Sequence, residues 1–398
     1  MRALLLTPLV VLAACAGRQT TSTTPTPQSE VRQLEPMRIT ATVDEGGAVE
    51  MGAYDAEMLF RQGNAQLESG HCDQAIPLYD RVADEFPDSR FVSPSLYNAG
   101  LCFMEGDELA DAAARFERLL RETPTSGDVK HARFQLAHVY LGLERWAESL
   151  AQAETLLHLD GLTPDERVEA MARAAQAELG ADHPREAAER ARSALAYART
   201  RPEDDRVQQV YHLAAANFVY AETLRLRAEA VQLPEGGVAV QRPVLERRAQ
   251  LILAAQTEYF DTMRHTHPEW AAAAGYRIGE MYDHFWEAIT TAPVPPPSRQ
   301  LTDEERALYD QEYRASLARL VKPLIRHSIR YWELTLLMVE RTGVSTEWTE
   351  RIRADLERAR QRLLSQPDGP EGIDAVDRSE NGSTGDRGGE ASPAQDAG

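Results

Sequence analysis

The residues with the most distinctive chemistry in this sequence are three cysteines, at positions 15, 72 and 102. Cys15 follows an apolar run at the amino terminus, which leaves an even pair, Cys72 and Cys102, for the body of the protein. Such a pair can form a disulfide if the compartment is oxidising. A zinc site is not expected, because His71 and Cys72 are adjacent and no second ligand pair stands at zinc spacing.

No pattern of catalytic residues occurs in the sequence. It contains no Walker phosphate loop, no Gly-x-Gly-x-x-Gly after a strand, no His-Glu-x-x-His and no Gly-x-Ser-x-Gly. His265 and His267 could contact a metal, but two histidines at a helix end are more often a solvated cap. The net charge of −20 argues against a nucleic-acid partner, whose phosphates require clustered Lys and Arg. We therefore expect neither an enzyme nor a cofactor.

The amino terminus predicts export. Arg2 precedes an apolar run, residues 3–14, which as a helix is only about 18 Å long. This is too short for a bilayer core of about 30 Å, so the run is typical of a signal peptide. Residues 16–50 are rich in Thr, Ser, Pro and Gln and predict a disordered tether.

The end of the apolar run, Leu12-Ala13-Ala14-Cys15, resembles the lipobox of bacterial lipoproteins. The resemblance implies cleavage before Cys15 and acylation of its thiol and new amino group, which together anchor the chain to a membrane. Ala16 is not the aspartate that retains such lipoproteins at the inner membrane. The resemblance thus implies the periplasmic side of the outer membrane. The alternative is a plain signal peptide whose cleavage site contains a cysteine.

One pattern returns in register along residues 56–161. An aromatic, a small and a second aromatic residue, three positions apart, occupy 97–103 and recur 37 residues later at 134–140. The same offset relates Pro87 to Pro124. A period of about 20 to 50 residues is typical of helical arrays. Apolar residues at helical spacing predict two helices in the second repeat, at 95–105 and 109–122.

The order of small, aromatic and proline positions resembles the tetratricopeptide repeat, a pair of antiparallel helices. Each 37-residue period is three residues longer than the usual tetratricopeptide repeat. In the first period these three residues lie between Pro87 and Gly100. In this respect the repeats resemble those of BamD-type lipoproteins and of the coordinator proteins of the Tol–Pal system. The fold expected is all-α, a tetratricopeptide-type array over residues 51–202.

The repeat register brings the two remaining cysteines together. Cys72 lies 15 residues before Pro87 and Cys102 lies 15 after it, so both are expected at the same end of neighbouring antiparallel helices. A disulfide there would close a loop of about 30 residues. Two small buried thiols are the alternative, since free cysteine packs as a hydrophobic residue.

Helical periodicity continues beyond the array, in a divergent region over 203–365. A helix is expected from Thr302 to about Arg341, with a break before Pro323. Short sequence segments near residues 292–305 and 343–348 resemble the carboxyl-terminal region of tetratricopeptide lipoproteins from myxobacteria. Some of those lipoproteins belong to gliding-motility complexes. The acidic segment 366–398 lacks apolar runs and is expected to be disordered.

A stacked array presents its first helices on a concave surface, which predicts where protein partners bind. By resemblance to peptide-binding arrays, the partner-facing residues would be Tyr97, Asn98, Leu101, Phe134 and His138. Packing between repeats is an equal alternative for Tyr97 and Phe134. The function expected is a membrane-anchored scaffold that binds envelope proteins or peptides. A BamD-like factor that receives outer-membrane proteins is an alternative, and a non-catalytic subunit of a cell-wall enzyme complex is a third.

Overall fold

The computed structural model describes residues 36–43, 49–343 and 345–365. The chain divides into two units, residues 1–55 and 56–398, which are described separately. The expected signal peptide, the lipobox with Cys15, the first part of the tether and the acidic segment 366–398 lie outside the described residues.

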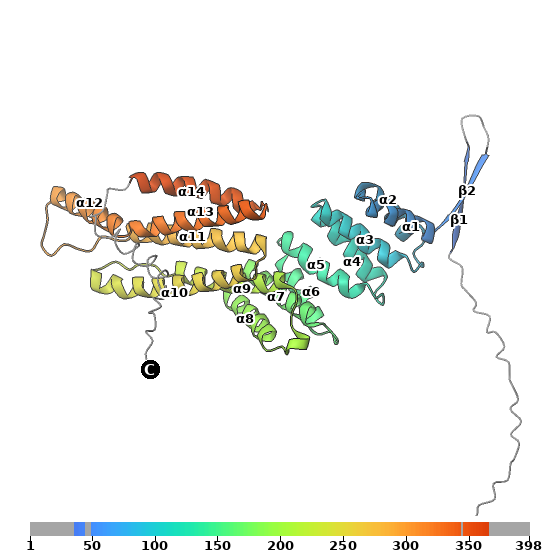
Figure 1. Cartoon of the computed structure of the whole chain (residues 1–398), viewed down its shortest axis with the longest axis horizontal. Helices are drawn as coiled ribbons and strands as arrows, with labels where there is room; N and C mark the ends of the chain where they lie inside the picture. The colour runs from blue at the N-terminus through green and yellow to red at the C-terminus, as the bar shows by residue number, and fades with distance from the viewer. Residues whose placement is uncertain (1–35, 44–48, 344, 366–398) are drawn as a thin grey trace, which may run out of the picture. The chain divides into compact units, whose positions relative to one another are not determined.

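The first unit contains a β-hairpin that the sequence analysis did not predict. Strands β1 (Met37–Val43) and β2 (Val49–Asp55) pair antiparallel, with Ile39 opposite Ala53 (Figure 1). The hairpin occupies positions assigned to the tether and to the start of the array. Residues with β-branched side chains favour strands. Strand β1 contains four of them, Ile39, Thr40, Thr42 and Val43.

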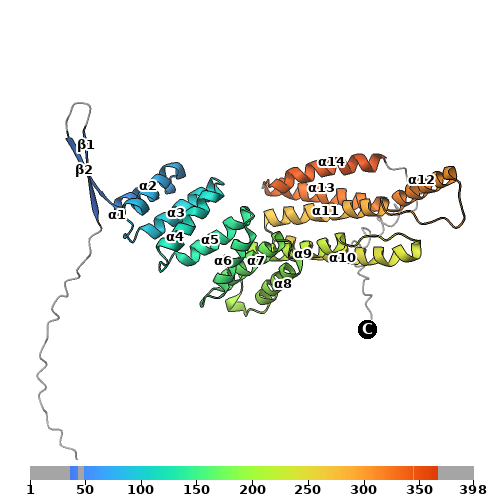
Figure 2. The same cartoon turned by 180° about the vertical axis from the view of Figure 1, so that it is seen from behind.

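The second unit begins with an array of helical hairpins, as predicted. Each first helix packs against the second helix of its own repeat, and each second helix packs against the first helix of the next repeat (Figures 1 and 2). Helix α4 has the bounds predicted from the sequence. The eight helices are α1 (Ala56–Glu68), α2 (Cys72–Glu85), α3 (Val92–Glu105), α4 (Leu109–Glu122), α5 (Val129–Gly142), α6 (Trp146–Leu157), α7 (Pro164–Gly180) and α8 (Pro184–Arg199).

Glycine and aromatic residues fix the close approach of paired helices. A Cβ atom added to Gly100 would lie 2.6 Å from the ring of Phe116, and one added to Gly63 would lie 2.7 Å from the ring of Tyr79. Both rings are fully buried. Only glycine leaves room for an aromatic ring at this position, which explains why the two residue types recur together.

The disulfide is present, as predicted. It joins Cys72 at the start of α2 to Cys102 in α3, with 5.3 Å between the Cα atoms. Cys102 is 2% exposed and packs in a cluster with Ala75, Tyr79 and Ala99. The crosslink therefore fixes the interface between the first two repeats, and the alternative of two free buried thiols does not apply.

Polar side chains also bridge neighbouring repeats, about one period apart. The Arg115 guanidinium donates to both carboxylate oxygens of Asp80, each at 2.8 Å. Arg190 pairs with Glu154 at 2.6 Å. Bidentate Arg–carboxylate contacts add geometric specificity to an interface. The bridges therefore help to set the stacking of one repeat on the next.

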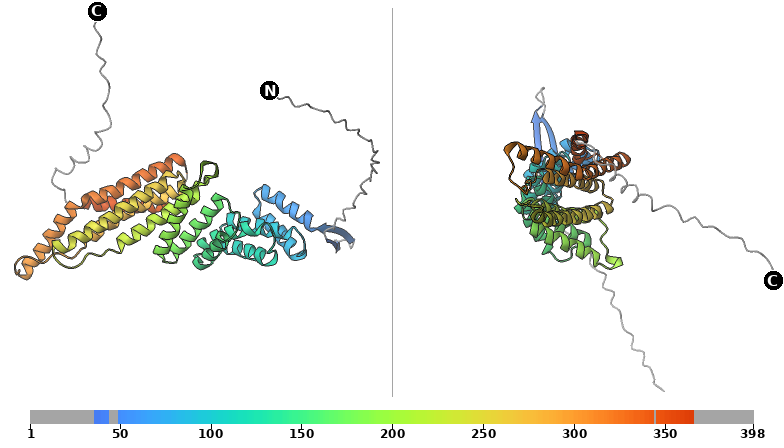
Figure 3. Two further views of the ribbon diagram at one scale, coloured as in Figure 1. Left: turned by 90° about the horizontal axis from the view of Figure 1, so that it is seen from below. Right: turned by 90° about the vertical axis from the view of Figure 1, so that its left-hand side faces the viewer.

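After α8 the helices become longer and their packing less regular. Helix α11 packs against α13 and α14, and α9 against α10 (Figure 3). The expected break before Pro323 is present, because α12 ends at Leu320 and α13 begins at Lys322. The helices are α9 (Val210–Glu229), α10 (Val238–Arg264), α11 (Pro268–Thr290), α12 (Asp303–Leu320), α13 (Lys322–Thr342) and α14 (Glu347–Ser365).

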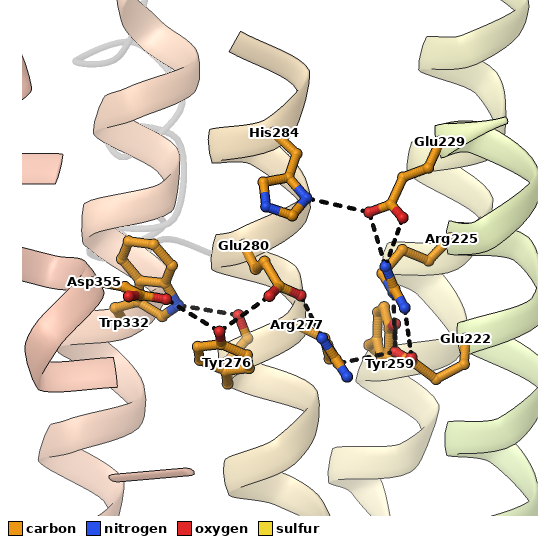
Figure 4. Close-up of polar contacts among 10 residues, drawn as sticks. All are labelled: Glu222, Arg225, Glu229, Tyr259, Tyr276, Arg277, Glu280, His284, Trp332 and Asp355. Atoms are coloured by element: carbon orange, nitrogen blue, oxygen red, sulfur yellow. Dashed lines mark hydrogen bonds and ion pairs between the residues drawn. The ribbon is translucent and has the colours of Figure 1, made fainter. Parts of the chain in front are cut away.

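A polar network crosses these longer helices (Figure 4). At its centre Glu222 of α9 is 4% exposed and accepts hydrogen bonds from Arg225, at 2.8 Å, and from the Tyr259 hydroxyl of α10. Arg277 of α11 lies 3.3 Å from the same carboxylate. Arg225 also donates to both oxygens of Glu229, at 2.8 Å. Each of these four charged side chains has a partner of opposite sign, which is the condition for burying charges without a large loss of stability.

The network continues toward α13 and α14. The Tyr276 hydroxyl donates to carboxylate oxygens of Glu280 and Asp355, each at 3.0 Å, and its backbone carbonyl accepts the indole N–H of Trp332, also at 3.0 Å. Trp332 covers Gly279, where an added Cβ would lie 2.3 Å from the indole nitrogen. These contacts join residues up to 79 positions apart. The network therefore holds the long helices in one packed block.

Candidate protein-binding surface

Polar side chains connect the successive first helices of the array. Asn98 of α3 donates to Asn64 Oδ1 of α1 at 3.2 Å. Gln135 of α5 donates to the Tyr97 hydroxyl of α3 at 3.5 Å. His212 of α9 lies 3.4 Å from Glu169 of α7. A row of side chains thus runs across α1, α3, α5, α7 and α9, and we call it the first-helix surface.

Two of the five expected partner-facing residues are engaged within the protein. The Asn98 amide donates both to Asn64 and, at 3.4 Å, to the Tyr79 hydroxyl. The Tyr97 ring packs against Phe116, with 5.7 Å between ring centroids, and is half-buried. Tyr97 therefore helps to stabilise the repeat and keeps part of its side chain accessible. Leu101, one turn further along α3, is also half-buried.

Phe134 lies in the core. It is 5% exposed and packs with Leu156 of α6 and Ala170 of α7. Of the two interpretations made from the sequence, packing between repeats describes its position. The side chain fills the interface between the third and fourth repeats and presents almost no surface to a partner.

His138 is exposed on the first-helix surface. The surrounding protein, followed by the positive charge of Arg173, lowers the pKa of its imidazole, although the charge of Glu169 acts in the opposite direction. Arg173, Glu169 and His212 of the neighbouring helices act on its charge, so the side chain lies beside these groups. At neutral pH its imidazole is uncharged and can both donate and accept a hydrogen bond.

Next to His138 lies a charged cluster that was not predicted. Arg173 donates to Glu169 Oε1 at 2.7 and 2.9 Å. Burial acts to raise the pKa of Glu169, but the hydrogen bond from His212 and the charge of Arg173 lower it to about 2. His212 is 6% exposed, and its Nδ1 atom has no hydrogen-bond partner within the described part of the chain. The spacing of Glu169 and Arg173 predicts a pair on one helix, but nothing in the sequence indicates His212 as a third member.

Neither a metal site nor a membrane-spanning helix is found in the part of the chain that the structure describes. No group of three or more His, Cys, Asp or Glu residues there is placed to hold a metal ion. His265, one of the two candidate metal contacts, instead lies with its Nε2 atom 2.8 Å from the Asn217 amide nitrogen. None of the described helices is long and apolar enough to cross a membrane.

Comparisons with known proteins identify the repeat. Residues 60–127 match the family model of the tetratricopeptide repeat. No curated protein matches the chain.

Several solved structures are similar over much of their length. A tetratricopeptide repeat protein from Parabacteroides merdae is 12% identical, with a TM-score of 0.38, and the match covers 76% of this chain and 98% of that one. The pilF protein of Pseudomonas aeruginosa is 15% identical, with a TM-score of 0.33 and coverage of 66% and 97%. YrrB, described as a tetratricopeptide protein with an unusual peptide-binding site, is 13% identical, with a TM-score of 0.32 and coverage of 63% and 96%.

Proposed function

Residues 60–127 are tetratricopeptide repeats, and from this premise we propose that the protein is a scaffold that binds protein partners of the cell envelope on its first-helix surface. Repeats of this type form extended concave surfaces suited to holding a peptide or a helix. The observation that carries the proposal is the row of mostly half-buried side chains that crosses successive first helices, from Asn64 to the buried His212.

The chemistry of the surface suits a polypeptide ligand. Leu101 and the accessible part of Tyr97 supply apolar contact, and the neutral imidazole of His138 can hydrogen-bond to a peptide backbone. The Asn98 amide is held by Asn64 and Tyr79 and acts as support for α3. Phe134 is excluded from the contact surface by its burial.

The location is part of the same proposal and depends on the sequence alone. The resemblance of residues 12–15 to a lipobox supports anchoring through acylated Cys15, on the periplasmic side of the outer membrane. Substitution Cys15→Ser should release the protein from the membrane fraction. Continued membrane association of that variant would contradict the anchor.

The surface is tested by crosslinking in the envelope fraction, with mass spectrometry to identify the proteins captured. The double variant Leu101→Ala/His138→Ala removes side chains from the first-helix surface. The matched control, His158→Ala/Leu159→Ala, removes the same residue types from an exposed site at the end of α6. Partners should be lost in the first variant and kept in the control, with equal helicity by circular dichroism. Equal capture by both variants would overturn the assignment of the surface.

A further inference from the structure

A large hollow lies between α8, α9 and α10. It has a volume of about 1190 Å³ and also contacts the segment that connects α8 to α9. Its polar lining contains five arginines against three acidic residues, within a chain whose net charge is −20. The charged residues are Arg192, Arg199, Arg201, Arg206, Arg264, Glu189, Glu258 and Asp261. We call this hollow the arginine groove.

Three of the arginines are exposed and have no ion-pair partner. Arg192 and Arg199 lie on α8, and Arg206 follows the short helix at Glu203–Asp205. No acidic side chain lies within ion-pair distance of these three in the part of the chain that the structure describes, whereas elsewhere in the same unit most arginines are paired. Unpaired guanidinium groups that share a groove make it attractive to carboxylates.

The other two arginines already have partners. Arg264 pairs with Asp261. Arg201 lies 3.4 Å from Asp205 and stacks on Tyr197, with 4.5 Å between the guanidinium carbon and the ring centroid. Its Nε–H is buried and has no hydrogen-bond partner among the described residues. Arg201 therefore adds positive charge to the wall of the groove but no accessible Nε donor.

The spacing of the arginines sets the kind of ligand. Arg192 and Arg199 are seven residues apart, so they lie on one face of α8 and about 10.5 Å apart along its axis. A peptide in the polyproline II conformation advances about 9 Å over three residues and returns to the same face every third residue. Carboxylates at positions i and i+3 of such an extended segment therefore match the two guanidinium groups.

The uncharged side chains that line the groove also suit a peptide ligand. The groove is also lined by Leu195, Ala196 and Val207, and by Leu213 and Tyr220 of α9. These side chains favour an apolar residue in the ligand between its two acids. Glu258 faces the groove, but its carboxylate is near Arg199, which offsets part of its charge. The acidic residues that line the groove therefore leave the positive charge of α8 in excess.

We propose that the arginine groove is a second binding site, distinct from the first-helix surface, for an extended acidic peptide segment of a partner protein. Arg192 and Arg199 would bind carboxylates three positions apart, and Arg206 would bind a third near the α8–α9 connection. No residue of the groove belongs to the five partner-facing residues expected from the sequence. The site gives the scaffold a preference for acidic sequences although its own net charge is negative.

The test measures binding of a short fluorescein-labelled peptide with aspartates three positions apart and leucine or valine between them, by fluorescence anisotropy with the full chain. The same peptide with asparagine in place of aspartate is the ligand control. The groove variant is Arg192→Glu/Arg199→Glu/Arg206→Glu. The protein control, Arg227→Glu/Arg247→Glu/Arg330→Glu, makes the same charge change at exposed arginines outside the groove.

The aspartate peptide should bind the unmodified protein and the protein control, and added salt should weaken both complexes. The groove variant should bind it roughly tenfold or more weakly, with unchanged helicity, and the asparagine peptide should not bind measurably. Equal weakening in both triple variants would show a general charge effect and overturn the site. Binding that appears only after the acidic residues of 366–398 are replaced by their amides would identify the chain's own acidic segment as the occupant, and would also overturn the proposal.

Discussion

The buried carboxylate of Glu222 gives the sharpest prediction about stability. Substitution Glu222→Gln keeps the shape of the side chain but removes its charge and replaces one acceptor oxygen by an amide donor. That donor would face Arg225, Tyr259 or Arg277, all of which now donate to Glu222 or lie against it (Figure 4). The substitution therefore leaves the buried Arg225 and the half-buried Arg277 with fewer partners and creates an opposed pair of donors.

The expected loss in the free energy of unfolding depends on the ion pairs that Arg225 and Arg277 keep after the substitution. Removing one member of a buried ion pair costs about 3–5 kcal/mol, because the other charge is left without compensation. Here Arg225 keeps Glu229 at 2.8 Å and Arg277 keeps Glu280 at 2.6 Å. We therefore expect a loss near the lower end of that range, about 3 kcal/mol in the free energy of unfolding. The control Glu333→Gln breaks a pair with Arg360 whose side chains are 48% and 49% exposed, and should cost less than about 1 kcal/mol.

The assay combines urea denaturation, followed by circular dichroism, with hydrogen exchange detected by mass spectrometry. Exchange is needed because a repeat array does not have to unfold in a single step. Faster exchange in Glu222→Gln should be concentrated in α9, α10 and α11. The reasoning is refuted if Glu222→Gln costs no more than Glu333→Gln, or if the loss of protection falls mainly in α1–α4.

Two further predictions concern the disulfide and the pH dependence of the network. The Cys72–Cys102 bond closes a loop with a sequence separation of 30 residues, so Cys72→Ala/Cys102→Ala should destabilise the first two repeats by about 3.5 kcal/mol in the chain-entropy model. Hydrogen exchange should accelerate in α1–α4, and unchanged exchange there would contradict the estimate. The hydrogen bond to Glu229 raises the pKa of His284 above its ordinary value. Burial alone would raise the pKa of Glu229, but His284 and Arg225 lower it to about 2. The raised pKa of His284 therefore adds stability that is fully present below about pH 6.5 and is lost as pH rises through the folded pKa of His284. His284→Gln should flatten this part of the stability profile in urea denaturation at a series of pH values; an unchanged slope would show that the pair is not responsible.

The periodic part of the fold could be read from the sequence because the signal is local. Gly100 and Phe116 specify one helical hairpin within 16 residues, and their counterparts return at a fixed offset. The bounds of α4 and the break before Pro323 likewise follow from short patterns. The β-hairpin was missed although Ile39, Thr40, Thr42 and Val43 carry a strand signal. The surrounding residues are rich in Thr, Ser and Pro, a composition typical of disordered segments, which masks the local β-branching.

The candidate sites were harder to predict, because burial and pairing are set by distant residues. Position 134 fits a partner-facing pattern, yet Leu156 and Ala170 enclose its ring. His212 meets Glu169 across 43 positions, and Tyr259 meets Glu222 across 37. The arginine groove has the same origin, since α8, α9 and α10 each contribute one wall. The order of residues along one chain does not indicate which charges share a surface.

The separation of contacting residues along the chain has a consequence for the order of folding. In the array the bridging contacts span about one repeat, as between Asp80 and Arg115, so each hairpin can dock soon after it is synthesised. In the long-helix block the contacts from Tyr276 to Asp355 and from Asp283 to Arg362 each span 79 positions. Helix α11 must therefore wait for nearly the whole chain before the apolar side chains around Tyr276 are covered. During that interval the nascent chain is most exposed to aggregation and most dependent on chaperones.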